Sequence, residues 1–222
     1  MAKHVRLWIS RQEFESPSGY YKLSNRDEVM KIGIDCDDVL SVSIAAFRKY
    51  FNKKYDKDLY YIRWEEPGKL GLTTNEFYKV WEDFCKADEH KKMDPIPHSF
   101  EVLKRLNKEH ELIVITARSK QLTDPTVEWI NTNFPNIFDN IHLINENNKI
   151  NTKTKLEVCK ELKIDIMIDD RLDNLLPCAK EGIKCIWFNQ YTTHKEKISY
   201  PKTNIIKVKS WQDIEKEIKE GK

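Results

Sequence analysis

Short apolar runs alternate with amphipathic stretches along most of this 222-residue chain. The apolar runs predict buried strands at residues 31–34, 112–115, 141–144, 164–168, 183–188 and 205–208. Helical spacing predicts helices at residues 42–50, 74–86, 99–109, 125–133, 154–162, 173–181 and 211–218, with Thr74 as the N-cap of the second. Because strands that alternate with helices form parallel sheets covered on both faces, this order predicts a Rossmann-like α/β fold.

Residues 44–94 interrupt this alternation, because they carry helical and aromatic patterns but no strand. They are expected to form a small helical cap inserted after the first core strand. The core would then comprise residues 30–43 and 95–222, and residues 1–29 would form an N-terminal extension.

Charge and composition exclude several classes of protein. Lys and Arg number 38 and Asp and Glu number 36, which argues against bulk nucleic-acid binding. Since no apolar run approaches the roughly 18 residues needed to cross a bilayer, and the N-terminus lacks the apolar stretch of a secretory signal, no membrane association is expected. The five cysteines are an odd number and include no C-x-x-C pair, which favours reduced, buried thiols in a cytoplasmic protein. A homodimer is left open.

Polar residues that can take part in catalysis or binding follow successive strands. They would lie at the edge of the sheet where parallel sheets bind ligands. The first strand is followed by Asp35 and Asp37, the second by Thr116, and the fourth by Asp169 and Asp170. Two lysines, Lys153 and Lys155, precede the helix that leads to the fourth strand, and either could reach the same edge.

These residue types together suit phosphoryl chemistry. Clustered carboxylates repel one another unless a cation lies between them, and a set of oxygen ligands suits Mg²⁺. One Asp can attack phosphorus, and a second Asp two residues on can protonate the leaving oxygen. A Thr hydroxyl and a Lys ammonium can hold the remaining phosphoryl oxygens.

Four stretches resemble the motifs of the haloacid dehalogenase superfamily of phosphatases, in the same order along the chain. They are Asp35-Cys36-Asp37-Asp38-Val39, Val114-Ile115-Thr116-Ala117-Arg118, Lys155, and Ile168-Asp169-Asp170. The stretch from Asp35 to Leu40, together with Ile168-Asp169-Asp170-Arg171, is most similar to the 5'(3')-deoxyribonucleotidases and their bacterial relatives.

The resemblance implies roles for individual residues. Asp35 would be the nucleophile and Asp37 the general acid and base. Phosphate-binding residues would be Thr116, Ala117, Lys120 and Lys155, with Lys155 preferred over Lys153 because the sequence after it fits the helix start of the family better.

The resemblance also implies a metal site. Mg²⁺ would be held by Asp35, the backbone carbonyl of Asp37, and Asp169, with Asp170 and Asp173 in support. The chain would then be a Mg²⁺-dependent phosphomonoester hydrolase that forms an aspartyl-phosphate. Its substrate would be small and phosphorylated, and a nucleoside monophosphate is favoured.

Two departures from the family concern substrate recognition. Members with a base-stacking aromatic carry it soon after the first motif, where this chain has Ser41-Val42-Ser43. Arg118 follows Ala117 in the second motif, as in less characterised bacterial members. Weak base selectivity is therefore expected.

Three other interpretations are open on the sequence. A 3'-phosphatase acting on nucleic-acid ends would use a basic track beside the site, for which Lys49, Lys53, Lys54, Lys149, Lys153, Lys155 and Lys160 are candidates. A receiver-like signalling module has the same residue types, but in another chain order. Cap aromatics such as Trp81 could line a base pocket or form the core of the cap, and the core is favoured.

Overall fold

A six-stranded parallel sheet organises the molecule. The computed structural model describes residues 29–60, 67–144, 153–190 and 204–220. The strands are β1 (Lys31–Ile34), β2 (Glu111–Thr116), β3 (Asn140–Leu143), β4 (Ile166–Asp169), β5 (Lys184–Phe188) and β6 (Ile205–Val208). Their order in the sheet is β3-β2-β1-β4-β5-β6, and all neighbouring strands are parallel. The predicted α/β fold is therefore confirmed.

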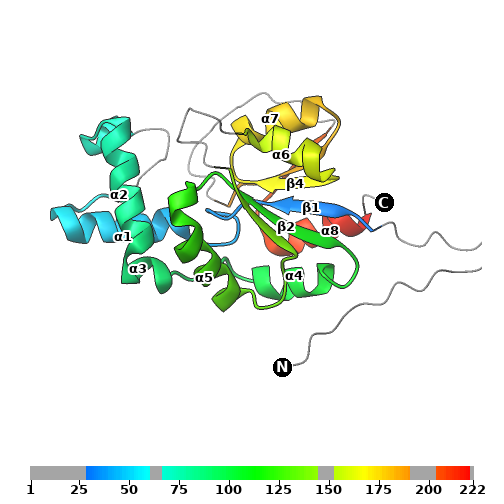
Figure 1. Ribbon diagram of the computed structural model, residues 1–222, viewed down its shortest axis with the longest axis horizontal. Coiled ribbons are helices and arrows are strands. Elements are labelled where there is room, and N and C mark those ends of the chain that lie inside the picture. Colours follow the sequence, from blue (N-terminus) through cyan, green and yellow to red (C-terminus); the bar gives the residue numbers. More distant parts are fainter. Residues whose placement is uncertain (1–28, 61–66, 145–152, 191–203, 221–222) are drawn as a thin grey trace, which may run out of the picture.

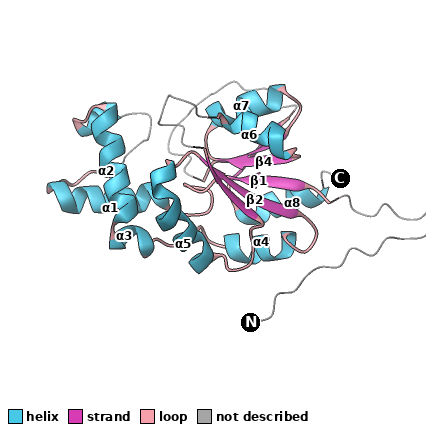
Figure 2. Cartoon of the chain, in the orientation of Figure 1, coloured by secondary structure: helices cyan, strands magenta, loops and turns pink. Residues whose placement is uncertain are grey.

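Helices cover both faces of this sheet, as Figures 1 and 2 show. The helices of the main layers are α4 (Ser99–Leu106), α5 (Thr123–Asn133), α6 (Lys155–Leu162), α7 (Leu172–Lys180) and α8 (Trp211–Glu220). One face carries α4 and α8 and the other carries α6 and α7. Two separate clusters of buried apolar side chains fill the two sides.

The connection between β1 and β2 contains the predicted helical insertion. Before α4 it forms α1 (Ser43–Tyr55), the short η1 (Pro67–Leu70), α2 (Thr74–Lys86) and α3 (Asp88–Lys91). These helices lie beyond one end of the sheet in Figure 1. The division of the chain at residues 44 and 95 stays a prediction, and nearly all of the expected N-terminal extension lies outside the described residues.

Aromatic packing holds the insertion together. The ring of Phe47 on α1 lies 5.4–5.6 Å from those of Phe77, Trp81 and Phe84 on α2, in edge-to-face arrangements. All four side chains are buried, so these α2 aromatics form the core of the insertion, as favoured. Tyr60, by contrast, is 89% exposed.

The N-cap of α2 differs from the prediction, which placed it at Thr74. The Thr73 side chain accepts a hydrogen bond from the Glu76 backbone N–H, and the Glu76 carboxylate accepts one from Thr73 N–H. This reciprocal capping box requires a spacing of three residues between hydroxyl and carboxylate. Thr73 satisfies that spacing and Thr74 does not.

All five cysteines are free and buried, as expected. Within the part of the chain that the structure describes, no helix is long and apolar enough to span a membrane.

Gly33 in the central strand β1 should not tolerate a larger side chain. A Cβ there would lie 2.9 Å from Met167 Sδ and 3.0 Å from Ile115 Cδ1. We expect Gly33→Val to lower the free energy of unfolding by about 1–3 kcal/mol, measured by urea denaturation, because overpacking forces neighbouring side chains aside. Gly68→Ala is the control, since a Cβ at Gly68 meets no atom within 4 Å. Equal midpoints for both variants would contradict this account.

Candidate active site

Three strands deliver the polar residues of the site to one edge of the sheet. Asp35 directly follows β1, Thr116 ends β2, and Asp169 ends β4. Because β1 lies between β2 and β4, these positions are neighbours. The Asp35 backbone N–H donates to the carbonyl of Ile168 at 2.9 Å, which extends the pairing of β1 and β4 by one residue beyond β1.

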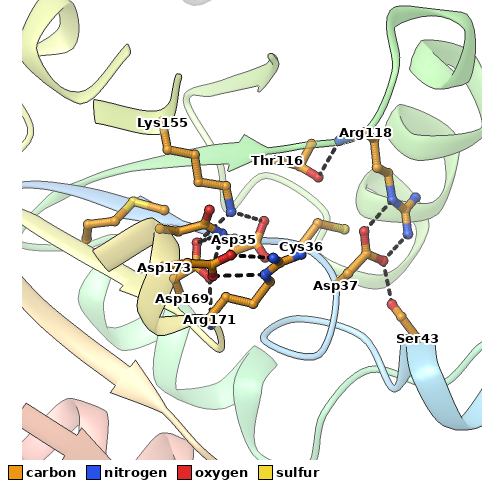
Figure 3. Close-up of polar contacts among 12 residues, drawn as sticks. Asp35, Cys36, Asp37, Ser43, Thr116, Arg118, Lys155, Asp169, Arg171 and Asp173 are labelled. Atoms are coloured by element: carbon orange, nitrogen blue, oxygen red, sulfur yellow. Dashed lines mark hydrogen bonds and ion pairs between the residues drawn. The ribbon is translucent and has the colours of Figure 1, made fainter. Parts of the chain in front are cut away.

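Carboxylates crowd at this edge. Oxygen atoms of Asp35, Asp169 and Asp170 all lie within 4.8 Å of one another, and Asp35 and Asp169 are buried. The ammonium of Lys155, the first residue of α6, lies 2.8 Å from Asp35 Oδ1 and 2.5 Å from Asp169 Oδ2, as Figure 3 shows.

The position of Lys155 decides between the two candidate lysines. Its side chain is buried between the acidic residues, whereas Lys153 is exposed and pairs with Glu161. Thr154 caps α6 between them and accepts a hydrogen bond from the Glu157 backbone N–H. The lysine after the cap therefore points into the site, and the one before it points to solvent.

One ammonium does not neutralise three carboxylates. Burial raises the pKa of Asp35 to about 7; the charge of Lys155 opposes this rise, and the charges of Asp169 and Asp37 add to it. Burial and the neighbouring carboxylates also raise the pKa of Asp170 well above its ordinary value. A divalent cation among these oxygens would relieve the repulsion, so the donor set fits a metal that prefers oxygen ligands.

Hydrogen bonds from residues that follow β4 hold the Asp169 carboxylate. Asn174 on α7 donates from its amide to both oxygens of Asp169 at 3.1 Å, and the Arg171 backbone N–H donates to Oδ1 at 2.8 Å. Asp173, the residue expected to support the metal, lies outside the three-carboxylate group. It is exposed and pairs with the Arg171 side chain.

Asp37 occupies a different electrostatic environment from Asp35. Arg118 Nε donates to its Oδ2 at 3.0 Å and Nη2 to its Oδ1 at 2.6 Å, and the Ser43 hydroxyl donates to Oδ1 at 2.5 Å. Burial alone would raise the pKa of Asp37, but the charge and hydrogen bonds of Arg118, helped by Ser43, hold it below its ordinary value. These contacts therefore favour the carboxylate form of Asp37.

The loop after β2 brings the other predicted residues to the edge. Thr116 is fully buried, and its hydroxyl accepts a hydrogen bond from the Arg118 backbone N–H at 3.3 Å. Ala117 is half-buried. Lys120 begins the short helix η2 (Lys120–Leu122) and is exposed, so its contact with a phosphate stays a prediction.

Three residues in the site were not predicted: Ser43, Arg118 and Asn174. Ser43 and Arg118 stand where the motifs depart from those of the deoxyribonucleotidases, and this departure was the available signal. No pattern in the sequence indicated Asn174, because an amide near a helix start is a common surface residue.

The fold occurs in solved structures of low sequence identity. A haloacid dehalogenase-like family hydrolase from Streptococcus pneumoniae aligns with a TM-score of 0.62 and 14% identity, over 84% of this chain and 96% of that one. The Bacillus subtilis protein YfnB bound to magnesium aligns with a TM-score of 0.59 and 11% identity, over 86% and 98%. At these identities the likeness shows that the chain has the same fold.

Sequence comparison shows the family to which the chain belongs. A family model described as "5' nucleotidase, deoxy (Pyrimidine), cytosolic type C protein" matches residues 28–222, and the chain belongs to this family. The Bacillus subtilis protein described as "Putative nucleotidase YqfW" is 30% identical over 188 residues, which are 82% of this chain and 90% of that protein. The family inferred from the motifs is therefore confirmed.

Repulsion in the carboxylate group should make the metal-free protein less stable as the pH rises. With a folded pKa of about 7 against an ordinary value of 3.8, Asp35 binds its proton more tightly in the folded state, and this contribution is lost as the pH rises towards 7. Asp35→Asn imitates the protonated form at every pH. In EDTA, we expect it to raise the free energy of unfolding by roughly 1–3 kcal/mol at pH 8, and by less at pH 5.

The control for this measurement is Asp58→Asn, at an exposed position outside the site. Denaturation curves at the two pH values give the comparison. A variant at Asp35 that is less stable than the wild type at pH 8 would show that Lys155 fully compensates the carboxylate.

Proposed function

We propose that the protein is a Mg²⁺-dependent 5'-nucleotidase that hydrolyses (deoxy)nucleoside monophosphates through an aspartyl-phosphate on Asp35. The observation that carries this proposal is the buried placement of Asp35 beside Lys155 and two further carboxylates at the carboxyl end of β1. Such a site can hold a phosphoryl group next to a nucleophile. The family of the chain indicates that a nucleotide carries this phosphoryl group.

In the first step, a carboxylate oxygen of Asp35 attacks phosphorus and forms a P–O bond. The bond from phosphorus to the ester oxygen of the substrate breaks, and Asp37 gives its proton to that oxygen. Lys155 and the Thr116 hydroxyl bind the other phosphoryl oxygens, where negative charge accumulates.

In the second step, water attacks the phosphorus of the aspartyl-phosphate and loses a proton to Asp37. The bond between phosphorus and the Asp35 oxygen breaks, which releases inorganic phosphate and restores the Asp35 carboxylate. The ion pair with Arg118 favours the ionised Asp37 that this step needs. For the first step Asp37 must be protonated, and the proton that it takes from water in the second step serves the next turnover.

The residues that would hold the metal are Asp35, Asp169 and Asp170, together with the backbone carbonyl of Asp37. Their oxygen-only chemistry and their mutual repulsion fit Mg²⁺, which is also the ion bound by the distant relative YfnB. When bound, the ion would neutralise charge between the nucleophile and the phosphoryl group. The Asp173 carboxylate is paired with Arg171 and lies outside the group of three carboxylates.

The insertion supports a small substrate. Helices α1, α2 and α3 lie beyond one end of the sheet in Figure 1. The chain enters them after β1 and Asp35, so this is the end at which the carboxylates lie. A lid at this end favours a phosphomonoester that is small enough to fit beneath it. Where family members with a base-stacking ring carry it, Ser43 donates to Asp37, so we infer weak discrimination among bases. A cytoplasmic location accords with nucleotide substrates and with the five free thiols.

A basic track for nucleic-acid ends has less support. Five of the candidate lysines pair with acidic side chains: Lys53 with Glu89, Lys54 with Asp83, Lys153 with Glu161, Lys155 with Asp35 and Asp169, and Lys160 with Glu181. Lys149 lies outside the described residues. The acidic partner of each lysine offsets its charge, which leaves little net positive charge to attract a polyanion.

Competition between two substrates tests the proposed function. With Mg²⁺ present, we expect kcat/KM for a deoxynucleoside 5'-monophosphate to exceed that for a 3'-phosphorylated oligonucleotide by at least tenfold, because the lid excludes the larger substrate. Asp35→Asn should abolish release of phosphate from both, which assigns the activity to this site. A tenfold preference for the oligonucleotide would identify a 3'-phosphatase instead, and undiminished turnover by Asp35→Asn would refute the covalent mechanism.

Removal of the metal should silence the enzyme reversibly. EDTA is expected to reduce release of phosphate by at least 100-fold, and Mg²⁺ in excess should restore it. Ca²⁺ should inhibit, because its longer and more variable bonds misplace the nucleophile. Full activity in EDTA would show that the carboxylate group does not act through a metal.

A further inference from the structure

Arg118 is the most extensively bonded buried cation near the site. All three nitrogens of its guanidinium make hydrogen bonds, and its side chain is only 1% exposed. Nε and Nη2 donate hydrogen bonds to the two carboxylate oxygens of Asp37, as Figure 3 shows. Nη1 donates to Thr126 Oγ1 on α5 at 3.1 Å and contacts His90 Nε2 at 3.0 Å. An arginine cannot accept a hydrogen bond, so His90 Nε2 is the acceptor.

Two of the partners of Arg118 belong to the helical insertion, although Arg118 itself comes from the loop after β2. His90 lies on α3, and the indole ring of Trp81 on α2 lies 5.7 Å from the guanidinium carbon. The ring of His90 packs edge-on against Phe84 at 5.5 Å. A continuous set of contacts therefore runs from the core of the insertion through Arg118 to the Asp37 carboxylate.

The two hydrogen bonds from Arg118 fix the plane and direction of the Asp37 carboxylate. Two parallel bonds from one guanidinium allow only one orientation, and the Ser43 hydroxyl adds a third bond at Oδ1. Proton transfer to a leaving oxygen needs a heavy-atom distance of about 2.6–3.2 Å, and a misplacement of about 1 Å can cost 100-fold in rate. The position of this carboxylate therefore bears directly on the step in which the ester bond breaks.

We propose that Arg118 is a positioning residue for Asp37 and that it couples the placement of the helical insertion to proton transfer at the leaving oxygen. The inference rests on the proposed function and deepens it. With the insertion in place, His90, Trp81 and Thr126 hold the guanidinium, and the guanidinium holds the carboxylate. When the insertion moves away, Arg118 loses two of its supports, and Asp37 loses its fixed orientation.

Leaving-group dependence distinguishes this role from a purely structural one. An alkyl leaving oxygen, as in a nucleoside monophosphate, must be protonated as the P–O bond breaks, whereas p-nitrophenolate is stable as an anion and needs little proton transfer. We expect Arg118→Ala to lower kcat/KM for a deoxynucleoside 5'-monophosphate by about 100-fold, within the range attributed to general acids. For p-nitrophenyl phosphate the loss should stay below tenfold.

A conservative variant provides the same test if the alanine variant fails to fold. Arg118→Lys keeps the charge but cannot form two parallel bonds to a carboxylate. It should show the same split between the two substrates. The matched control is Arg105→Ala, which removes another two-bond contact, the one to Glu215, on the exposed surface outside the site. This control should leave both substrates within twofold of the wild type.

Two further variants test the route through Asp37 and through the insertion. If Arg118 acts through Asp37, the double variant Asp37→Asn/Arg118→Ala should lose no more nucleotide turnover than Asp37→Asn alone. His90→Leu removes one support of the guanidinium from the insertion side. It should lower kcat for the nucleotide about five- to twentyfold and leave p-nitrophenyl phosphate within twofold.

Equal losses on both substrates in the Arg118 variants, or additive losses in the double variant, would overturn the positioning role. An effect of His90→Leu on KM alone would overturn the coupling to the insertion. These failures are distinct from failure of the proposed function. If Asp35→Asn abolishes turnover of both substrates while the Arg118 variants show no split, the phosphatase stands and only this inference falls.

Discussion

Charge compensation at the carboxyl end of β1 is the constraint on which the rest of the site depends. Asp35, Asp169 and Asp170 lie so close together that their negative charges would repel strongly if unopposed. The buried ammonium of Lys155 supplies one positive charge, and Asn174 and the Arg171 backbone N–H supply hydrogen bonds. Burial raises the pKa of Asp35, and the charges of Asp169 and Asp37 add to this rise. The same uncompensated charge explains the fit of the site to a divalent cation.

The sheet topology makes this concentration of charge possible. The chain adds strands on both sides of β1, which places β2 and β4 as its neighbours and sets the ends of three strands side by side. Ligands bind in parallel sheets at such a switch point. The insertion with α1, α2 and α3 follows β1 at this same point, so the first helix of the insertion begins only eight residues after the nucleophile Asp35.

The sequence predicted the strands well because a fully buried strand is a short apolar run, and all six runs became strands with ends shifted by at most two residues. Asp35 and Asp169 were predictable for a related reason, since each directly follows or ends such a run. The cap of α2 was misplaced by one residue because two threonines stand together and only the spacing to Glu76 distinguishes them.

Side-chain direction was harder to predict than position along the chain. On the sequence, either Lys153 or Lys155 could extend towards the site. Lys155 is the first residue of α6, and the helix start directs its side chain inwards. Asp173 and Asn174 are consecutive residues of α7, but their side chains point in different directions. Asp173 pairs with Arg171, and Asn174 donates a hydrogen bond to Asp169. Arg118 was beyond local reasoning, because its partners His90 and Asp37 are 28 and 81 residues away.

Two carboxylates separated by one residue thus acquire opposite character from the cations beside them. Asp35 shares Lys155 with Asp169 and lies among like charges, and its pKa is raised. Asp37 has Arg118 at both of its oxygens, and its pKa is lowered. Divergent environments of this kind allow neighbouring acids to take different roles in one reaction. Because Asp35 is the more crowded of the two, it gains most from a cation. The side chain of Asp37 is already paired with Arg118, so only its backbone carbonyl would contact that cation.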